Sequence, residues 1–318
     1  MSSGSSRFVV WAALAGNVLV ALTKFGAAAF TGSSAMLSEG VHSLVDSGNE
    51  VVMLYGMRRA ARPPDERHPL GHGRELYFWS FIVAILIFAV GAGVSLFEGI
   101  MHVRRPEPVS SFVVNYVVIG LALLFESGSW WVAVKAFRRA KGADVGYVTA
   151  VRRSKDPPIF MVLVEDTAAL LGLVIALAGT AAADVWDAPV FDGAASIGIG
   201  LLLGVVALFL ARESKGLLIG EPARPEIVRS IESIARAEKG VDHAAVLLTA
   251  HLGPREIIAA VSVDFADGLS AATVETLAAS LDAKIRRAHP DVSTVLIVPQ
   301  SLATFRRTLQ QERRLAEG

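Results

Sequence analysis

The chain has 318 residues, of which 53% are hydrophobic, and its mean hydropathy is +0.50. Soluble domains are about 45–50% apolar, so this composition predicts a membrane protein. The formal net charge is +0, which argues against nucleic acid as a partner. The absence of cysteine excludes disulfides and thiolate metal sites. A bound metal would be held by histidine, carboxylate, asparagine, backbone oxygen or water.

Apolar stretches long enough for membrane helices occur along the first two thirds of the chain. A hydrocarbon core about 30 Å thick requires about 20 helical residues. Six stretches qualify, at residues 8–30, 35–57, 77–101, 112–134, 158–181 and 194–211. The first is too long for the core of a signal peptide, so we expect it to be retained as a membrane helix.

The loops between these stretches differ in charge. The loops after the second and fourth stretches are rich in arginine and lysine, whereas the fifth connection carries Asp184, Asp187 and Asp192 without a cation. Positive charge favours the cytoplasmic side, so both termini are predicted to be cytoplasmic. The composition, rich in alanine and arginine, and the short polar N-terminus indicate the inner membrane of a bacterial cell.

The pattern changes near residue 223. An amphipathic helix is expected at 225–239, strands at 244–250 and 256–265, a second helix at 270–289 and a last strand at 293–298. The fold class predicted is an α-helical bundle of six transmembrane helices over residues 1–222, followed by a small cytosolic α+β domain of order αββαβ, ferredoxin-like, over 223–300. Residues 301–318 read as a polar tail.

Ionisable residues within the membrane stretches are costly, at about 2.5–3.5 kcal/mol each on insertion scales, and are functional candidates. In the second stretch, Glu39, His42, Asp46 and Asn49 follow a spacing that places them on one helix face. The other acids at this depth are Glu50, Glu98, Glu126, Glu165 and Asp166. We expect no buried lysine or arginine to neutralise them, so a bound cation or a proton would do so.

The pair His42 and Asp46 is separated by one helical turn and can hold one divalent ion. Asp166, beside Glu165 and near the middle of its helix, would complete a site between two facing helices. The alternative is that these acids are buried polar groups that hydrogen-bond across helices. A second set, Asp65, His68 and His72, lies in the loop before the third stretch and has the residue types of a zinc site, although polar loops often contain histidine without binding metal.

These residues carry a resemblance to a known family. HSLVDSGNE at 42–50 and PDERHPLGHGRE at 64–75 resemble the cation diffusion facilitator family, as do DGAASIGIGLLL at 192–203 and LLIGEPA at 217–223. The run at 156–179, DPPIFMVLVEDTAALLGLVIALAG, is similar to a divergent branch related to an animal mitochondrial zinc transporter.

The resemblance implies a homodimeric, proton-coupled efflux antiporter of divalent metal, in which zinc is the usual substrate and protons are the counter-ion. It implies a transport site at His42, Asp46 and Asp166, and a loop site at Asp65, His68 and His72. The family's fourth transport ligand falls on Val162 here, which leaves Glu165, Asn49 or water for that place. The last strand, STVLIVPQ, has no ligand, so metal binding by the cytosolic domain is expected to be weak or absent.

One alternative function remains open, and another is not supported by the sequence. A membrane metal sensor or scaffold that keeps the fold without transporting is permitted by Val162. An intramembrane enzyme has no support, since the chain has no HExxH motif and no phosphate-binding glycine loop. A site of nitrogen and oxygen ligands also accepts Mn²⁺, Co²⁺, Ni²⁺ or Fe²⁺ in place of Zn²⁺.

Overall fold

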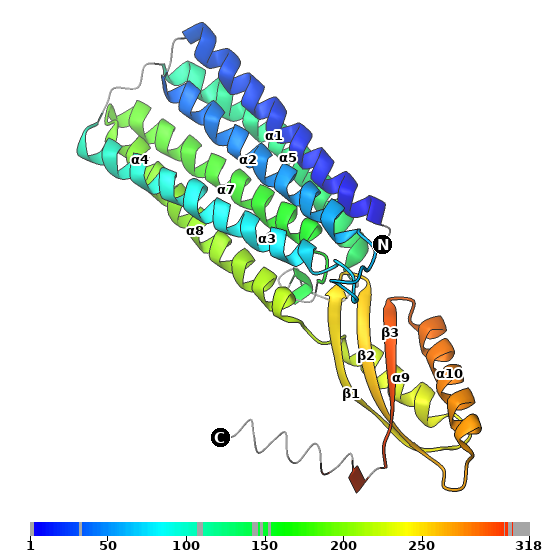
Figure 1. Ribbon diagram of the computed structural model, residues 1–318. Helices are drawn as coiled ribbons and strands as arrows, with labels where there is room; N and C mark the ends of the chain where they lie inside the picture. The colour runs from blue at the N-terminus through cyan, green and yellow to red at the C-terminus, as the bar shows by residue number, and fades with distance from the viewer. Residues whose placement is uncertain are drawn as a thin grey trace. The chain divides into compact units, whose positions relative to one another are not determined.

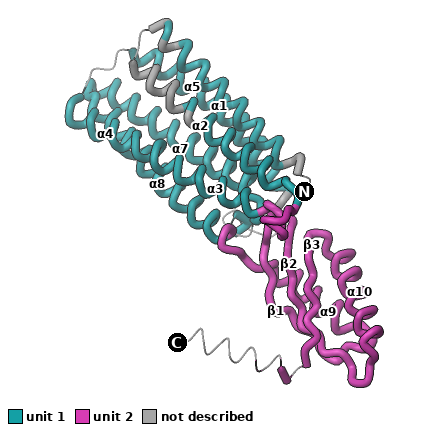
Figure 2. Tube along the Cα trace, in the orientation of Figure 1, with its two compact units in different colours: residues 1–63, 74–216 teal, residues 64–73, 217–318 magenta. Residues whose placement is uncertain are grey.

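The computed structural model describes residues 3–31, 34–106, 111–141, 146, 149–151, 154–301, 303–304 and 307. The chain divides into two compact units (Figure 2). The first contains residues 1–63 and 74–216, and the second contains residues 64–73 and 217–318. The loop at 64–73 is therefore part of the second unit, although in sequence it interrupts the first.

The first unit is a bundle of long helices that lie side by side (Figure 1). Its elements are α1 (Ser3–Thr31), α2 (Ser34–Ala60), α3 (Glu75–Leu86), the π-helical segment η1 (Ile87–Ala92), α4 (Gly93–Arg104), α5 (Phe112–Ala140), α7 (Pro157–Trp186) and α8 (Val190–Ile219). Each of the six predicted apolar stretches falls within one of these helices or within the continuous run from α3 to α4.

Five helical segments among the described residues are long and apolar enough to cross a membrane, at residues 6–26, 75–104, 112–139, 157–186 and 190–219. The sixth predicted stretch is α2, which has 27 residues and packs against α1 and α3. Its polar residues lower its mean hydropathy, so length and packing rather than composition place it in the bundle. The protein is a multi-pass membrane protein with the predicted helical fold.

Small residues allow α4 and α8 to cross closely. A Cβ atom at Gly99 would lie 2.7 Å from the backbone nitrogen of Ile197 and 2.8 Å from the carbonyl oxygen of Gly193. A Cβ atom at Gly200 would lie 2.9 Å from the backbone nitrogen of Leu96. Helices in lipid associate through such close contacts, because burial from water does not drive them together.

The second unit contains the predicted αββαβ order. Its elements are α9 (Pro225–Arg236), β1 (Val241–Gly253), β2 (Glu256–Phe265), α10 (Ala271–Ala288) and β3 (Val292–Pro299). The sheet order is β1-β2-β3, with β1 antiparallel and β3 parallel to β2. Alternate residues of β2 share one core with both helices, as expected for a sheet covered on one face; the members include Ile231, Ile257, Val261, Leu281 and Ile285.

Candidate metal sites

An acid-lined cavity of about 440 Å³ lies inside the helical bundle. Its lining comes from α1, α2, α5, α7, α8 and the run from α3 to α4. Five carboxylates line it: Asp46, Glu98, Glu126, Glu165 and Asp166. The π-helical segment also borders the cavity through Ile87, Val90 and Gly91. Such segments often occur at functional sites.

Hydrogen bonds from neighbouring helices hold the two acids of α7. Asp166 is 3% exposed, and its Oδ2 accepts a hydrogen bond of 2.8 Å from Oγ of Ser129 on α5. Oε1 of Glu165 accepts one of 3.2 Å from the amide nitrogen of Asn49 on α2. These bonds join α2, α5 and α7 around the cavity and orient the carboxylate oxygens that accept them.

Of the two ligands predicted on α2, the structure describes the side chain of Asp46 but not that of His42. Asp46 lines the cavity together with Asn49. His42 lies in α2 one turn before Asp46, but its side chain is outside the described residues, as is that of Glu39. The structure thus brings Asp46, Glu165, Asp166 and Asn49 to one cavity, and the place of the His42 imidazole stays a prediction.

Val162 is buried in α7 and does not line the cavity. It therefore offers neither a ligand nor a wall to the space between the acids. Both protein groups considered for the fourth place, Glu165 and Asn49, do line the cavity and are hydrogen-bonded to each other. Glu165 lies three residues after Val162, about one helical turn along α7, so a carboxylate is present near the position where the valine offers no ligand.

Glu50 fits the alternative of a buried polar group that bonds across helices. It is 3% exposed, and its Oε1 accepts a hydrogen bond of 2.9 Å from the side-chain amide of Asn17 on α1. Its Oε2 has no hydrogen-bond partner among the described residues. Glu50 does not line the cavity, which separates it from the five acids that do.

The expectation that no buried basic residue accompanies the acids is wrong. Lys24 on α1 is 7% exposed and lines the same cavity. Its ammonium donates a hydrogen bond of 2.9 Å to Oγ of Ser43 on α2. A lysine in the last quarter of an apolar stretch usually extends along the helix to reach water, so sequence alone favoured an exposed ammonium.

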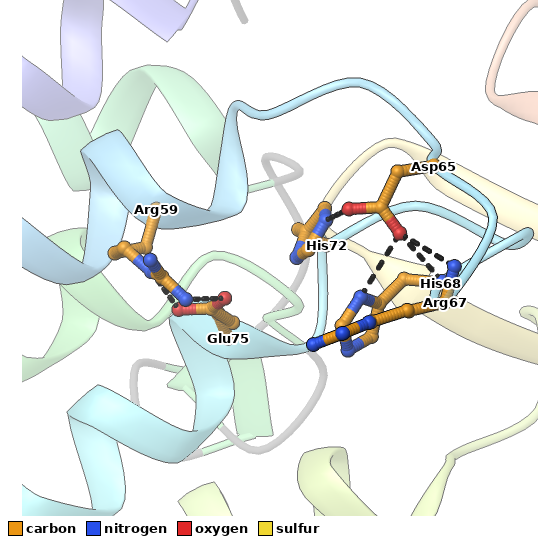
Figure 3. Close-up of polar contacts among 6 residues, drawn as sticks. All are labelled: Arg59, Asp65, Arg67, His68, His72 and Glu75. Carbon is orange, nitrogen blue, oxygen red and sulfur yellow. Dashed lines mark hydrogen bonds and ion pairs between the residues drawn. The ribbon is translucent and has the colours of Figure 1, made fainter.

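A second candidate site lies wholly within the second unit, in the loop at 64–73. Asp65, His68 and His72 each offer one ligand atom within 4.8 Å of the others. Oδ2 of Asp65 is 3.0 Å from Nε2 of His72, and Oδ1 is 3.2 Å from Nδ1 of His68 (Figure 3). Two imidazoles and a carboxylate at this spacing are a donor set for a zinc-like divalent ion.

The local backbone organises the Asp65 carboxylate. Its Oδ1 also accepts hydrogen bonds from the backbone N–H groups of Arg67, at 2.9 Å, and His68, at 2.7 Å. The hydrogen bond with His72, followed by that from the His68 backbone, lowers the pKa of Asp65 to about 2. The carboxylate is therefore ionised at any physiological pH and available to a cation.

The loop at 64–73 packs against the turn between β1 and β2. A Cβ atom at Gly73 would lie 2.4 Å from the carbonyl oxygen of Leu252 and 2.6 Å from Oε2 of Glu256. The backbone of the loop can approach the hairpin this closely only because residue 73 is glycine. Burial raises the pKa of the nearby Glu256 carboxyl.

The other histidines of the second unit lie on β1 or directly after α10, outside the loop at 64–73. His251, in β1, is buried and its Nδ1 is 3.3 Å from the carbonyl oxygen of Gly253. His289, directly after α10, has its Nε2 2.8 Å from Oγ of Ser230. His243 lies on β1, and Asp291 directly precedes β3. Within the described residues, the cluster at Asp65, His68 and His72 is the one group of three that meets the spacing of a metal site.

A helical membrane bundle around an acid-lined cavity has the arrangement of a membrane cation transporter. The model of the cation efflux transmembrane domain matches residues 10–219. The chain belongs to the cation diffusion facilitator family of cation efflux transporters.

Three relatives give the range of similarity. A Homo sapiens relative, the mitochondrial proton-coupled zinc antiporter SLC30A9, is 33% identical over 258 residues, which cover 81% of this chain and 45% of that protein. Metal tolerance protein C4 of Arabidopsis thaliana is 32% identical over 263 residues, covering 82% of this chain and 57% of that protein. The cation-efflux pump FieF of Klebsiella pneumoniae is 27% identical over 304 residues, covering 93% and 94%. This chain thus spans about half the length of the first two relatives.

Proposed function

We propose that this protein is a proton-coupled antiporter that exports a divalent metal ion, with Zn²⁺ as the first candidate. The observation that carries the proposal is the convergence of carboxylates from α2, α4, α5 and α7 on one cavity within a membrane bundle. Two of the named relatives are a proton-coupled zinc antiporter and a cation-efflux pump.

The transport site consists of Asp46, Glu165 and Asp166, with Asn49 as a neutral oxygen donor and His42 as the predicted imidazole ligand. Metal binds when the carboxylates are ionised, because protons and metal compete for the same oxygen atoms. Protons that enter from the opposite side of the membrane displace the ion. The site then returns to its first orientation without a bound metal ion. Ions and protons then exchange across the membrane as the bundle opens alternately to each side.

The loop site at Asp65, His68 and His72 binds the same class of ion outside the bilayer. The metal there is held by two imidazoles and one carboxylate, which leaves a fourth position for water or another group. We assign both termini to the cytoplasm of a bacterial cell with the transporter in its inner membrane, acting as a homodimer. These assignments rest on the loop charges and on the family.

The test is metal flux into proteoliposomes under an imposed pH gradient, with Zn²⁺, Mn²⁺, Co²⁺ and Ni²⁺ screened in turn. Asp46→Asn and Asp166→Asn should each reduce flux at least about ten-fold, the scale at which changes to metal-site residues act. Asp184→Asn is the matched control, because Asp184 lies on α7 with Asp166 but is exposed and outside the cavity. Flux in the Asp166→Asn variant equal to that of the unmodified protein would refute the site.

A second candidate function, a non-transporting metal sensor, is favoured by one observation, the valine at position 162. Its signature is metal binding at Asp65, His68 and His72 without flux of any metal. Flux that requires the pH gradient, Asp46 on α2 and Asp166 on α7 would exclude the sensor function.

A further inference from the structure

We propose that Lys24 is a fixed cation of the transport cavity, which repels the bound metal ion and thereby weakens its binding. The inference rests on the proposed transport site. Lys24 is 7% exposed, and among the described residues that line the cavity it is the one basic side chain. A positive charge thus shares one cavity with the acids that bind the metal.

The position of the ammonium follows from its contacts. It donates a hydrogen bond of 2.9 Å to Oγ of Ser43, and Ser43 lies three residues before Asp46 on α2. Residues three apart on a helix are neighbours on one face, about 5–6 Å apart at Cβ. Lys24 also interacts electrostatically with Glu126 on α5. The hydrogen bond places the ammonium beside α2, near the position of Asp46, and the electrostatic interaction shows that its charge also acts on Glu126.

A buried ammonium requires compensation. Removing it from water is costly unless the charge is hydrogen-bonded and paired with charges of opposite sign. The carboxyl groups that line the cavity can supply those charges: Asp46 on α2, Glu98 on α4, Glu126 on α5, and Glu165 and Asp166 on α7. Lys24 therefore offsets about one negative charge of the empty site.

The same charge acts on an incoming ion. Two positive charges in a medium of low dielectric repel each other with an energy that increases as their separation decreases, and the effect is doubled for a divalent ion. A transport site must bind its ion tightly enough to load and weakly enough to release. Lys24 contributes to that balance because its charge weakens metal binding although it is not itself a ligand.

A purely structural role makes the opposite prediction. If Lys24 only fastened α1 to α2 through Ser43, its removal would loosen the site and weaken metal binding. If its charge opposes the metal, a neutral residue of similar length would strengthen binding. Tighter binding is therefore the result that separates the two roles.

The test is Zn²⁺ binding measured by calorimetry on the full-length protein in detergent. All samples carry His68→Ala and His72→Ala, so that the heat reports the cavity and not the loop site. Lys24→Met should bind Zn²⁺ at least about ten-fold more tightly than the parent, whereas Lys24→Arg, which keeps the charge, should bind like the parent. Lys24→Gln is a second neutral variant, with an amide that can still donate to Ser43.

Each outcome decides the proposal. Unchanged or weaker binding in a folded neutral variant would overturn it, and so would failure of both neutral variants to fold while Lys24→Arg folds. Asp166→Asn in the same background tests the site itself. If the parent binds no Zn²⁺, or Asp166→Asn binds as tightly as the parent, the proposed transport site fails, and the role of Lys24 fails with it. Loss of binding in Asp166→Asn with Lys24→Met unchanged refutes the role of Lys24 alone.

Discussion

Ser129 on α5 donates a hydrogen bond of 2.8 Å to Asp166 on α7, and both side chains are buried. The bond fixes one oxygen of a carboxylate that lines the cavity. It also links two helices that pack along their length. An orienting contact of this kind determines where a ligand atom points as well as how stably the helices associate.

Ser129→Ala should reduce Zn²⁺ affinity of the cavity about 10–100-fold, the usual effect of losing a group that orients a metal ligand. It should also lower the free energy of unfolding by about 1–3 kcal/mol, because a buried carboxylate oxygen loses its donor. Calorimetry and denaturant unfolding in detergent measure the two effects. Ser127→Ala, on the exposed face of the same helix, is the control and should leave both unchanged.

Arg59 and Glu75 join α2 to the start of α3 by two hydrogen bonds, from Nε at 2.7 Å and Nη2 at 2.8 Å (Figure 3). The side chains are 29% and 23% exposed. Two hydrogen bonds between one guanidinium and one carboxylate should make a measurable contribution to the free energy of unfolding, reduced by contact with solvent. We expect Arg59→Lys to lose most of that contribution, because an ammonium cannot make both bonds.

A double-mutant cycle of Arg59→Ala and Glu75→Ala measures this coupling. The control cycle uses Arg229 and Glu226, whose closest atoms are 3.7 Å apart and whose side chains are 73% and 70% exposed. That pair should show no coupling. Equal coupling energies in the two cycles would contradict the assignment of Arg59 and Glu75 as a structural link.

The extent of each helix shows what the sequence patterns could predict. The apolar stretch predicted at 194–211 corresponds to α8, which continues to Ile219 through Arg212, Glu213 and Lys215. Hydropathy identifies where a chain leaves the hydrocarbon, whereas backbone hydrogen bonding determines where the helix ends. The two ends coincide only where a helix breaker follows the last apolar residue.

The candidate sites were predictable only in part. Periodicity and the cost of intramembrane charge identified the acids that line the cavity, because both depend on local sequence. Lys24 was missed, since its side chain is long enough to point either inward or toward water. The membership of residues 64–73 in the second unit was not predicted, because it depends on packing between segments almost 180 residues apart.

The packing of the loop at 64–73 against the turn between β1 and β2 depends on Gly73. Gly73→Ala should distort the loop, because the new Cβ would lie 2.4 Å from a backbone oxygen that cannot rotate away. We expect Zn²⁺ affinity at the loop site to fall by at least about ten-fold, since His72 is the adjacent residue and the spacing of the metal ligands would change. Calorimetry on protein carrying Asp166→Asn isolates this site.

Gly120→Ala provides the matched control. A Cβ atom there has nothing within 4 Å, and the residue lies inside helix α5, so the change should be neutral or slightly stabilising. Loop-site affinity in Gly73→Ala equal to that in Gly120→Ala would show that the loop does not depend on its contact with Leu252.

The lowered pKa of Asp65 predicts how the loop at 64–73 responds to acid. Its pKa is lowered to about 2, against an ordinary value of about 3.9. A carboxyl whose pKa is lowered by folding stabilises the folded loop fully above the ordinary value, and that stabilisation is lost as the pH falls toward 2. The backbone N–H groups of Arg67 and His68 should therefore stay protected from hydrogen exchange down to about pH 4 and lose protection below it.

Nuclear magnetic resonance of the side-chain carboxyl carbons would follow Asp65 directly, with the exposed neighbour Glu66 as an internal comparison. Titration of Asp65 near 3.9 would refute the hydrogen-bonded arrangement. Any change in metal binding at this loop between pH 5 and 7 must then arise from groups other than Asp65, because its carboxylate remains ionised over that range. Imidazoles bind metal only in the neutral form, so loss of Zn²⁺ on mild acidification would assign the pH response to His68 and His72.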